Sequence, residues 1–238
     1  FGALADGITT ITGFLDGEDC LATLNAFRAM GVVIDGPDQG RVTVHGVGLH
    51  GLQAPVGPLD LGNSGTSMRL MSGILAGQAF DSVLTGDASL TGRPMRRITE
   101  PLSLMGARIA AGNRGTAPLQ IHGGQRLIGI DYPLPVASAQ IKSGLLLAGL
   151  YAEGITRITE PAPTRDHTER MLEGFGYPLR RESERTVALS GGGRLTAIPI
   201  DVPADISSAA FFLVGASIAP GSDLRLEHVG VNPTRTGV

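Results

Sequence analysis

The chain has a single cysteine, no tryptophan and few aromatic residues, which make up 4% of its 238 residues. One cysteine, Cys20, excludes an internal disulfide and favours a reducing compartment, so we expect a cytoplasmic protein. No apolar run approaches the ~20 residues that a membrane-spanning helix needs, and no signal-peptide pattern opens the chain. A formal net charge of only −3 argues against a protein that wraps nucleic acid or coats an anionic membrane.

Lysine is almost absent too, because Lys142 is the single lysine beside 18 arginines. Genomic base composition explains such a bias, but planar guanidinium groups are also well suited to binding carboxylates and phosphates. Glycine, in contrast, is abundant: the chain has 35 glycines, about twice the usual share of ~7%. This excess favours a fold with many tight turns, or loops that wrap anions.

Three segments share one pattern, in which a short β-branched strand and a polar loop precede an amphipathic helix. These are residues 8–31, 82–106 and 155–176. Each helix is expected to end at a glycine, the usual residue just past a helix C-terminus. Gly31, Gly106 and Gly176 are 75 and 70 residues apart, which indicates an internal repeat.

Two short alternating strands and a second, apolar helix follow each glycine. The second helices begin at Ser64, Ser138 and Ser207. We therefore expect an α/β fold with a single pseudo-threefold domain over residues 1–238, in units of approximately 8–81, 82–154 and 155–223. The apolar helices should pack inside with their N-termini at one end, where unpaired N–H groups and positive dipole ends bind anions.

The loops before these helices hold the candidate binding residues. Residues 62–66 form a glycine–hydroxyl loop that could cradle an anion, or Ser64 or Asn63 could be an ordinary N-cap. Arg93 and Arg165 lie at helix starts in equivalent loops, where a cation opposes the helix dipole. An anionic ligand would resolve that conflict, so we expect both to bind one. Arg235, in the NPTRTG segment, is a weaker candidate of the same kind.

Other polar residues have simpler interpretations. Capping explains Ser138, and a solvated first helical turn explains Gln140 and Lys142. Glu169 fits a first helical turn, where acids are favoured. The five histidines and Cys20 show no metal-ligand spacing, so we expect no metal.

Four motifs in order resemble those of the 5-enolpyruvylshikimate-3-phosphate (EPSP) synthase family: LGNSGTSMRLM, GDASLTGRPM, PVASAQIKSGLLLAGL and TRDHTERML. The resemblance implies an inside-out α/β barrel of three βαβαββ units, with this chain as the N-terminal domain portion and the second domain absent. It also implies transfer of the enolpyruvyl group of phosphoenolpyruvate to the 5-hydroxyl of shikimate 3-phosphate. No organic cofactor is implied.

The resemblance assigns residues to both substrates. Those for shikimate 3-phosphate are Ser138, Ala139, Gln140 and Arg165. Those for phosphoenolpyruvate are Asn63, Gly65, Arg93 and again Gln140. Many relatives have Ser-Ser-Gln where this chain has Ser-Ala-Gln, so one hydroxyl contact is missing or replaced. Gly65 leaves room for the inhibitor glyphosate. The catalytic groups would lie in the absent domain, so we expect a monomer that is inactive alone.

Two alternatives remain open at this point. One is the sister enolpyruvyltransferase that acts on a UDP-aminosugar, but that enzyme normally carries a reactive cysteine in a mobile loop, and nothing comparable is seen here. The other is a non-catalytic anion-binding module. Turnover by the isolated chain would separate an enzyme from such a module.

Overall fold

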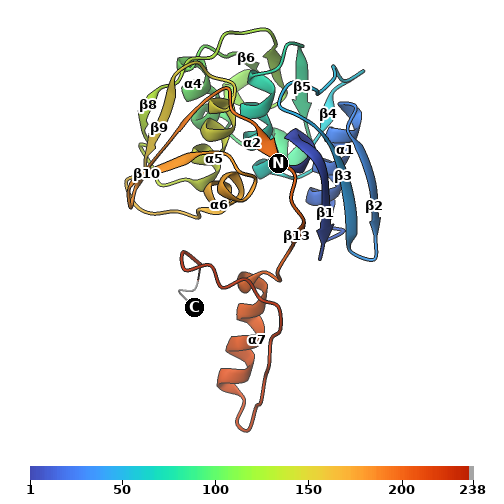
Figure 1. The fold of residues 1–238 in the computed structure, drawn as a ribbon. Coiled ribbons are helices and arrows are strands. Elements are labelled where there is room, and N and C mark those ends of the chain that lie inside the picture. The colour runs from blue at the N-terminus through green and yellow to red at the C-terminus, as the bar shows by residue number, and fades with distance from the viewer. Residues whose placement is uncertain (236–238) are drawn as a thin grey trace.

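Three sheets with the same strand order surround the core of the computed structural model, which describes residues 1–235 (Figure 1). The first sheet has the order β12 (Leu195–Thr196), β1 (Ala5–Thr12), β3 (Arg41–Val47), β2 (Val33–Asp38). The second has β4 (Leu59–Asp60), β5 (Ser82–Thr85), β7 (Leu119–His122), β6 (Arg108–Ala111). The third has β8 (Asp131–Pro133), β9 (Ile155–Thr159), β11 (Thr186–Ser190), β10 (Leu179–Ser183). This equivalence confirms the predicted repeat.

Each sheet contains a short strand from the preceding unit, which pairs in parallel with the first strand of the next unit. In this way β4 pairs with β5 and β8 pairs with β9. The ring closes because β12 and a further short strand, β13 (Ile200–Asp201), both pair in parallel with β1. The start of the described chain and residues 195–201 therefore belong to one sheet.

The first helix of each unit ends two residues before the predicted glycine. These helices are α1 (Glu18–Ala29), α4 (Arg96–Leu104) and α6 (His167–Gly174). Gly31, Gly106 and Gly176 have φ angles of 85°, 100° and 76°. Such left-handed backbone favours glycine, which is why the helices stop there. A short helix, α3 (Ala88–Thr91), precedes α4.

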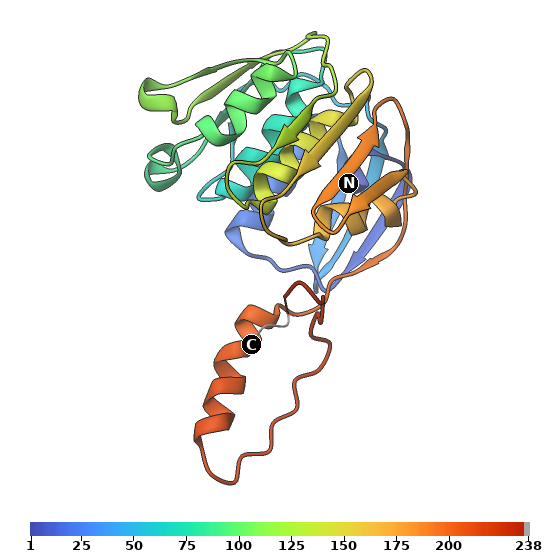
Figure 2. The same cartoon turned by 90° about the vertical axis from the view of Figure 1, so that its left-hand side faces the viewer.

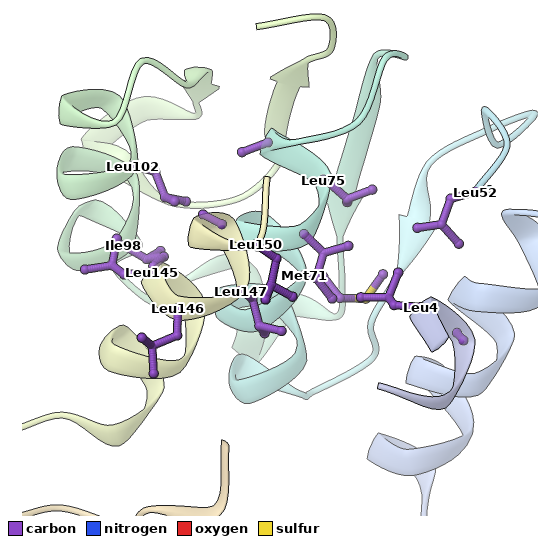
Figure 3. Packing of buried hydrophobic residues seen from close by; sticks show 14 of the residues in the cluster. Leu4, Leu52, Met71, Leu75, Ile98, Leu102, Leu145, Leu146, Leu147 and Leu150 are labelled. Atoms are coloured by element: carbon purple, nitrogen blue, oxygen red, sulfur yellow. The ribbon is translucent and has the colours of Figure 1, made fainter. Parts of the chain in front are cut away.

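Two apolar second helices, α2 (Gly65–Ala76) and α5 (Ala139–Gly149), pack against each other inside the sheets (Figure 3). Their backbones approach so closely that a Cβ atom on Gly73 would lie 2.0 Å from the carbonyl oxygen of Gly144. Leu145 and Leu146 are fully buried around this contact. Strands outside and helices inside are the inside-out arrangement that the family resemblance implies.

The prediction that the third apolar helix packs beside these two was wrong. Helix α7 (Ile206–Ile218) lies outside the body, as both views show (Figures 1 and 2). Phe211 is 82% exposed, and Ala209 is the buried apolar residue of this helix. The physical reason is that β13 runs off the edge of the first sheet and the chain then extends away from the body. An apolar sequence indicates that the side chains of a helix are to be buried, but it does not indicate which surface buries them.

The first sheet has a short 3₁₀ turn, η1 (Gly2–Leu4), where the other two sheets have α2 and α5. Beside it lies an apolar groove of about 450 Å³. Phe14, Phe27 and Val44 line the groove on the side of the sheet and α1, and Ser64 and Ser67 line it at the start of α2. No helix within residues 1–235 is both long and apolar enough to cross a lipid bilayer.

Candidate functional site

The loop before α2 is held by a dense set of short-range hydrogen bonds. Gly62 has a left-handed φ of 55°, which turns the chain after β4. Ser64 is the N-cap of α2 and accepts a hydrogen bond from the backbone N–H of Ser67 at 3.2 Å. The Ser67 hydroxyl in turn lies 2.6 Å from the Thr23 hydroxyl of α1. The N-cap interpretation of Ser64 is therefore confirmed, and it leaves Asn63 free for another role.

Asn63 holds Arg93 in place. Its side-chain oxygen accepts a hydrogen bond from Arg93 Nη2 at 2.5 Å, and its Nδ2 donates to Asp87 Oδ2 at 2.7 Å. Asp87 is also the N-cap of α3, where it accepts from the Leu90 N–H at 2.7 Å. The Leu90 N–H and the Asn63 amide both favour the carboxylate form, so the pKa of Asp87 lies below its usual value.

Arg93, Arg69 and Arg97 form a group of three guanidinium-bearing side chains. Burial, together with repulsion from Arg93 and Arg97, lowers the pKa of Arg69. Among residues 1–235, none of the three has a carboxylate oxygen within the 4.0 Å of an ion pair. A cluster of positive charge that no carboxylate neutralises favours an anionic ligand beside these arginines.

Gly65 lies against this group of arginines. A Cβ atom at this position would lie 2.8 Å from Arg69 Nη1 and 3.1 Å from Arg93 Nη1. Both contacts are to the ends of flexible side chains, so a larger residue would move the guanidinium groups rather than the backbone. The absence of a side chain at Gly65 therefore sets where the two arginines lie.

A second concave site lies at the start of α5. Its cavity measures about 390 Å³ and is lined by Ala137, Ser138, Ala139, Gln140, Thr164, Arg165 and Thr234. Ser138 is the N-cap of α5 and accepts from the Ile141 N–H at 3.4 Å. All four residues that the resemblance assigns to shikimate 3-phosphate thus line one cavity. Arg165 is exposed there and makes no hydrogen bond or ion pair with the rest of residues 1–235.

Gln140 joins the two sites. Its Nε2 donates to Thr66 Oγ1 at 2.8 Å, and its Oε1 accepts from Arg69 Nη1 at 3.1 Å. Both partners belong to α2, so the N-termini of α2 and α5 lie side by side, as the sequence predicts for the second helices of the first two units. A smaller cavity of about 160 Å³ lies at this junction and is lined by Thr66, Gln140 and Arg165, among others.

One sequence interpretation needs correction. Lys142 does not occupy a solvated first turn, because it is 1% exposed and paired with two carboxylates. Glu169, one of those partners, lies in the first turn of α6, as the sequence predicts, and is buried there. Arg235, the weaker candidate, donates to the Ser207 hydroxyl and lies 3.9 Å from Asp205 at the start of α7. The last two residues of the NPTRTG segment, 236 and 237, lie outside the described residues.

Sequence reasoning missed the roles of Asp87, Thr66 and Arg97 near the predicted residues. Asp87 could have been found, because an acid directly before a short helix is a typical N-cap. The contact between Thr66 and Gln140 depends on how α2 and α5 pack, which the sequence alone does not reveal. In the part of the chain that the structure describes, no three His, Cys, Asp or Glu side chains are grouped to hold a metal ion.

Comparison with known proteins identifies the family. The model of the family described as EPSP synthase (3-phosphoshikimate 1-carboxyvinyltransferase) matches residues 1–238. The chain belongs to the EPSP synthase family.

Similar proteins within the family include two curated relatives and a solved structure. The 3-phosphoshikimate 1-carboxyvinyltransferases of Alkalilimnicola ehrlichii and Methylococcus capsulatus are 74% and 71% identical over the whole chain. The EPSP synthase structure from Acinetobacter baumannii is 64% identical, with a TM-score of 0.95 over the whole chain. The chain spans about half the length of these proteins, 53% or 54% in each case.

Proposed function

We propose that this chain forms half of an enzyme that transfers the enolpyruvyl group of phosphoenolpyruvate to the 5-hydroxyl of shikimate 3-phosphate. The hydroxyl oxygen adds to C2 of phosphoenolpyruvate and loses its proton while C3 gains one, which gives a tetrahedral intermediate. C3 then loses a proton as the C2–O bond to phosphate breaks and phosphate leaves. The observation that carries the proposal is the pair of cationic helix N-termini joined by Gln140. A reaction between two multiply anionic substrates needs two such sites side by side, and the names of the relatives support the same reaction.

The cavity at the start of α5 is suited to shikimate 3-phosphate. Arg165 provides a guanidinium group with no partner among residues 1–235, and the first turn of α5 provides backbone N–H groups. Ser138 and Gln140 can hydrogen-bond the phosphate and ring hydroxyls. Ala139 contributes only a methyl group, so its side chain makes no polar contact with this substrate.

Phosphoenolpyruvate would bind beside Gly65 and Arg93. Asn63 orients Arg93. The Gln140 Oε1 and the Gly65 carbonyl oxygen orient Arg69, because both accept hydrogen bonds from its Nη1. Because these charges are fixed before a substrate arrives, little rearrangement is needed as negative charge shifts during addition and elimination. Gln140 would contact both substrates from its position between the sites.

Helix α7 supports the proposal that a second domain completes the enzyme. Its exposed apolar side chains, including Phe211 and Phe212, need cover, and the relatives contain about as much chain again. In this proposal the groups that transfer protons lie in that domain, so residues 1–238 bind substrates without turnover. A monomeric state and a cytoplasmic location are also proposed, the latter because a single cysteine favours a reducing compartment.

Calorimetric titration of shikimate 3-phosphate into the purified chain tests the proposal. We expect saturable binding that is lost in Arg165→Ala. Arg180→Ala is the matched control, since Arg180 is an exposed arginine of β10 outside both cavities. Equal binding by both variants, or no binding by the unmodified chain at millimolar ligand, would contradict the proposed site. Measurable phosphate release by the chain alone would contradict the proposal that turnover needs the second domain.

A further inference from the structure

A buried ionic cluster lies behind the α5 cavity. Lys142 Nζ lies 2.8 Å from Glu160 Oε2 and 2.6 Å from Glu169 Oε1, and all three side chains are almost completely buried. One ammonium group therefore faces two carboxylates out of contact with water. Such a group is expensive to bury, and replacing it with apolar residues is often neutral or stabilising. Stability is thus a weak reason for its presence, and the proposed reaction does not use it.

The two carboxylates have different second contacts. Glu160 follows β9, and its Oε1 accepts a hydrogen bond from the Thr164 hydroxyl. Thr164 is the residue directly before Arg165. Glu169 lies in the first turn of α6, and its Oε2 is buried with no hydrogen-bond partner among residues 1–235. Glu160 therefore connects the ammonium group to the loop that carries Arg165 through Thr164, whereas Glu169 connects it to the first turn of α6.

Lys142 lies in the same turn of α5 as a proposed substrate-binding residue, so the connection links that turn to the loop of Arg165. Lys142 and Gln140 belong to the same first turn, where Gln140 faces α2 and Lys142 faces the end of β9 and α6. On the other side of Arg165, Asp166 accepts hydrogen bonds from Arg170 Nε and Asn232 Nδ2, both at 2.8 Å. Arg165 itself has no such contact, so its neighbours in sequence determine where it lies.

We propose that Lys142, Glu160 and Thr164 are positioning residues for Arg165. They fix the loop of residues 160–166 to the turn of α5 that carries Gln140, and thereby set the separation between the Arg165 guanidinium and the other ligands of the same phosphate. This inference rests on the proposed function, because it assumes that the cavity binds shikimate 3-phosphate. Phosphoenolpyruvate, which would bind beside Arg93, should not depend on this connection.

Thr164→Val tests the connection with the smallest change, since it removes one hydroxyl and leaves the ionic cluster intact. We expect the affinity for shikimate 3-phosphate to fall by about fivefold, the usual effect of losing one hydrogen bond, with unchanged affinity for phosphoenolpyruvate. Amide hydrogen exchange over residues 162–167 should become faster without ligand. Thr164→Ser should restore both properties, because it restores the hydroxyl.

The matched control is Thr159→Val, at the end of β9. Its hydroxyl lies 3.2 Å from the Thr186 hydroxyl and does not contact the cluster. We expect wild-type exchange and affinity in this variant. Lys142→Met should have the same effects as Thr164→Val or larger ones. It leaves two carboxylates facing each other and so could prevent folding. In that case the result for Thr164→Val alone tests the positioning role.

The outcomes separate this inference from the proposed function. If the unmodified chain binds shikimate 3-phosphate and Thr164→Val behaves like Thr159→Val in both measurements, the positioning role is wrong and the function stands. If Thr164→Val weakens both substrates equally, the effect is general and the positioning role is again wrong. If the unmodified chain binds no shikimate 3-phosphate, the proposed function fails, and the positioning of Arg165 for this ligand fails with it.

Discussion

The side-chain oxygen of Gln140 accepts a hydrogen bond from Arg69 at 3.1 Å, across the interface between α5 and α2. The two residues are 71 positions apart in the chain and lie within the first two turns of equivalent helices in two successive repeats. Threefold repetition therefore brings two anion-binding helix ends together, and one amide joins them. A substitution at the N-terminus of α2 or of α5 is therefore expected to change ligand binding at the N-terminus of the other helix as well.

Gly65→Ala should reduce binding at the phosphoenolpyruvate site without unfolding the chain. The added methyl group would displace Arg69 Nη1, 2.8 Å away, and press on Arg93. We expect weaker calorimetric binding of phosphoenolpyruvate and, in the full-length enzyme, reduced inhibition by glyphosate. Gly215→Ala is the control, since its Cβ meets nothing within 4 Å. An inhibition curve unchanged by Gly65→Ala would show that this glycine does not shape the site.

Gly73→Ala should destabilise the chain strongly. A Cβ atom there would lie 2.0 Å from the Gly144 carbonyl oxygen, and a backbone atom cannot move aside as a flexible side chain can. Forcing α2 and α5 apart should cost about 1–3 kcal/mol or more of unfolding free energy, which urea denaturation measures. The same substitution at Gly215 provides the comparison, with a small gain from helix propensity. Equal stability of Gly73→Ala and the parent chain would contradict the packing described here.

Asp87 should make the site sensitive to acid. Its pKa is below the ordinary 3.8 in the folded chain because hydrogen bonds from the Leu90 N–H and the Asn63 amide favour its carboxylate. Its stabilising contribution is therefore complete above the unfolded-state pKa and is lost as the pH falls through the folded-state pKa. In Asp87→Asn, the decrease in thermal midpoint between about pH 5 and pH 2 should be smaller than in the parent chain. Identical pH profiles would exclude this role.

Truncating two phenylalanines should change the unfolding free energy by very different amounts. Phe175 is fully buried after α6, and Phe175→Ala should cost about 3–5 kcal/mol of unfolding free energy. Phe211 is largely exposed on α7, so Phe211→Ala should stay within about 0.5 kcal/mol. Light scattering of the same variants should show less self-association in Phe211→Ala, because an exposed apolar side chain is removed. Equal destabilisation by both changes would mean that α7 packs on the body in solution.

Local signals predicted the parts of the fold that depend on local chemistry. Gly31, Gly106 and Gly176 mark helix ends because their backbone conformation is costly for other residues, and this is visible in the sequence. Ser64 and Ser138 cap their helices for an equally local reason, whereas α7 is capped by Asp205 and begins one residue before the predicted Ser207. The candidate site followed from the same logic and from the family resemblance.

Features that depend on packing were not predictable in this way. The first turn of α5 looks solvated from its sequence, yet Lys142 is buried because Glu160 and Glu169 come from elements 18 and 27 residues later. The apolar stretch of α7 indicates burial but carries no information about the surface that buries it. Arg235 repeats the pattern of Arg93 and Arg165, but its side chain contacts Ser207 and Asp205 at the start of α7.

The pairing of β13 with β1 also determines the order in which the three sheets can form during synthesis. Ile11 pairs with Ile200, and Thr12 Oγ1 donates to Asp201 Oδ1 at 2.8 Å, across 189 residues of chain. During synthesis the first sheet therefore remains open along β1 until residues 195–201 have left the ribosome, whereas the second sheet can be complete once residue 122 has emerged. A chain of this topology begins its first sheet before the other two and finishes it last.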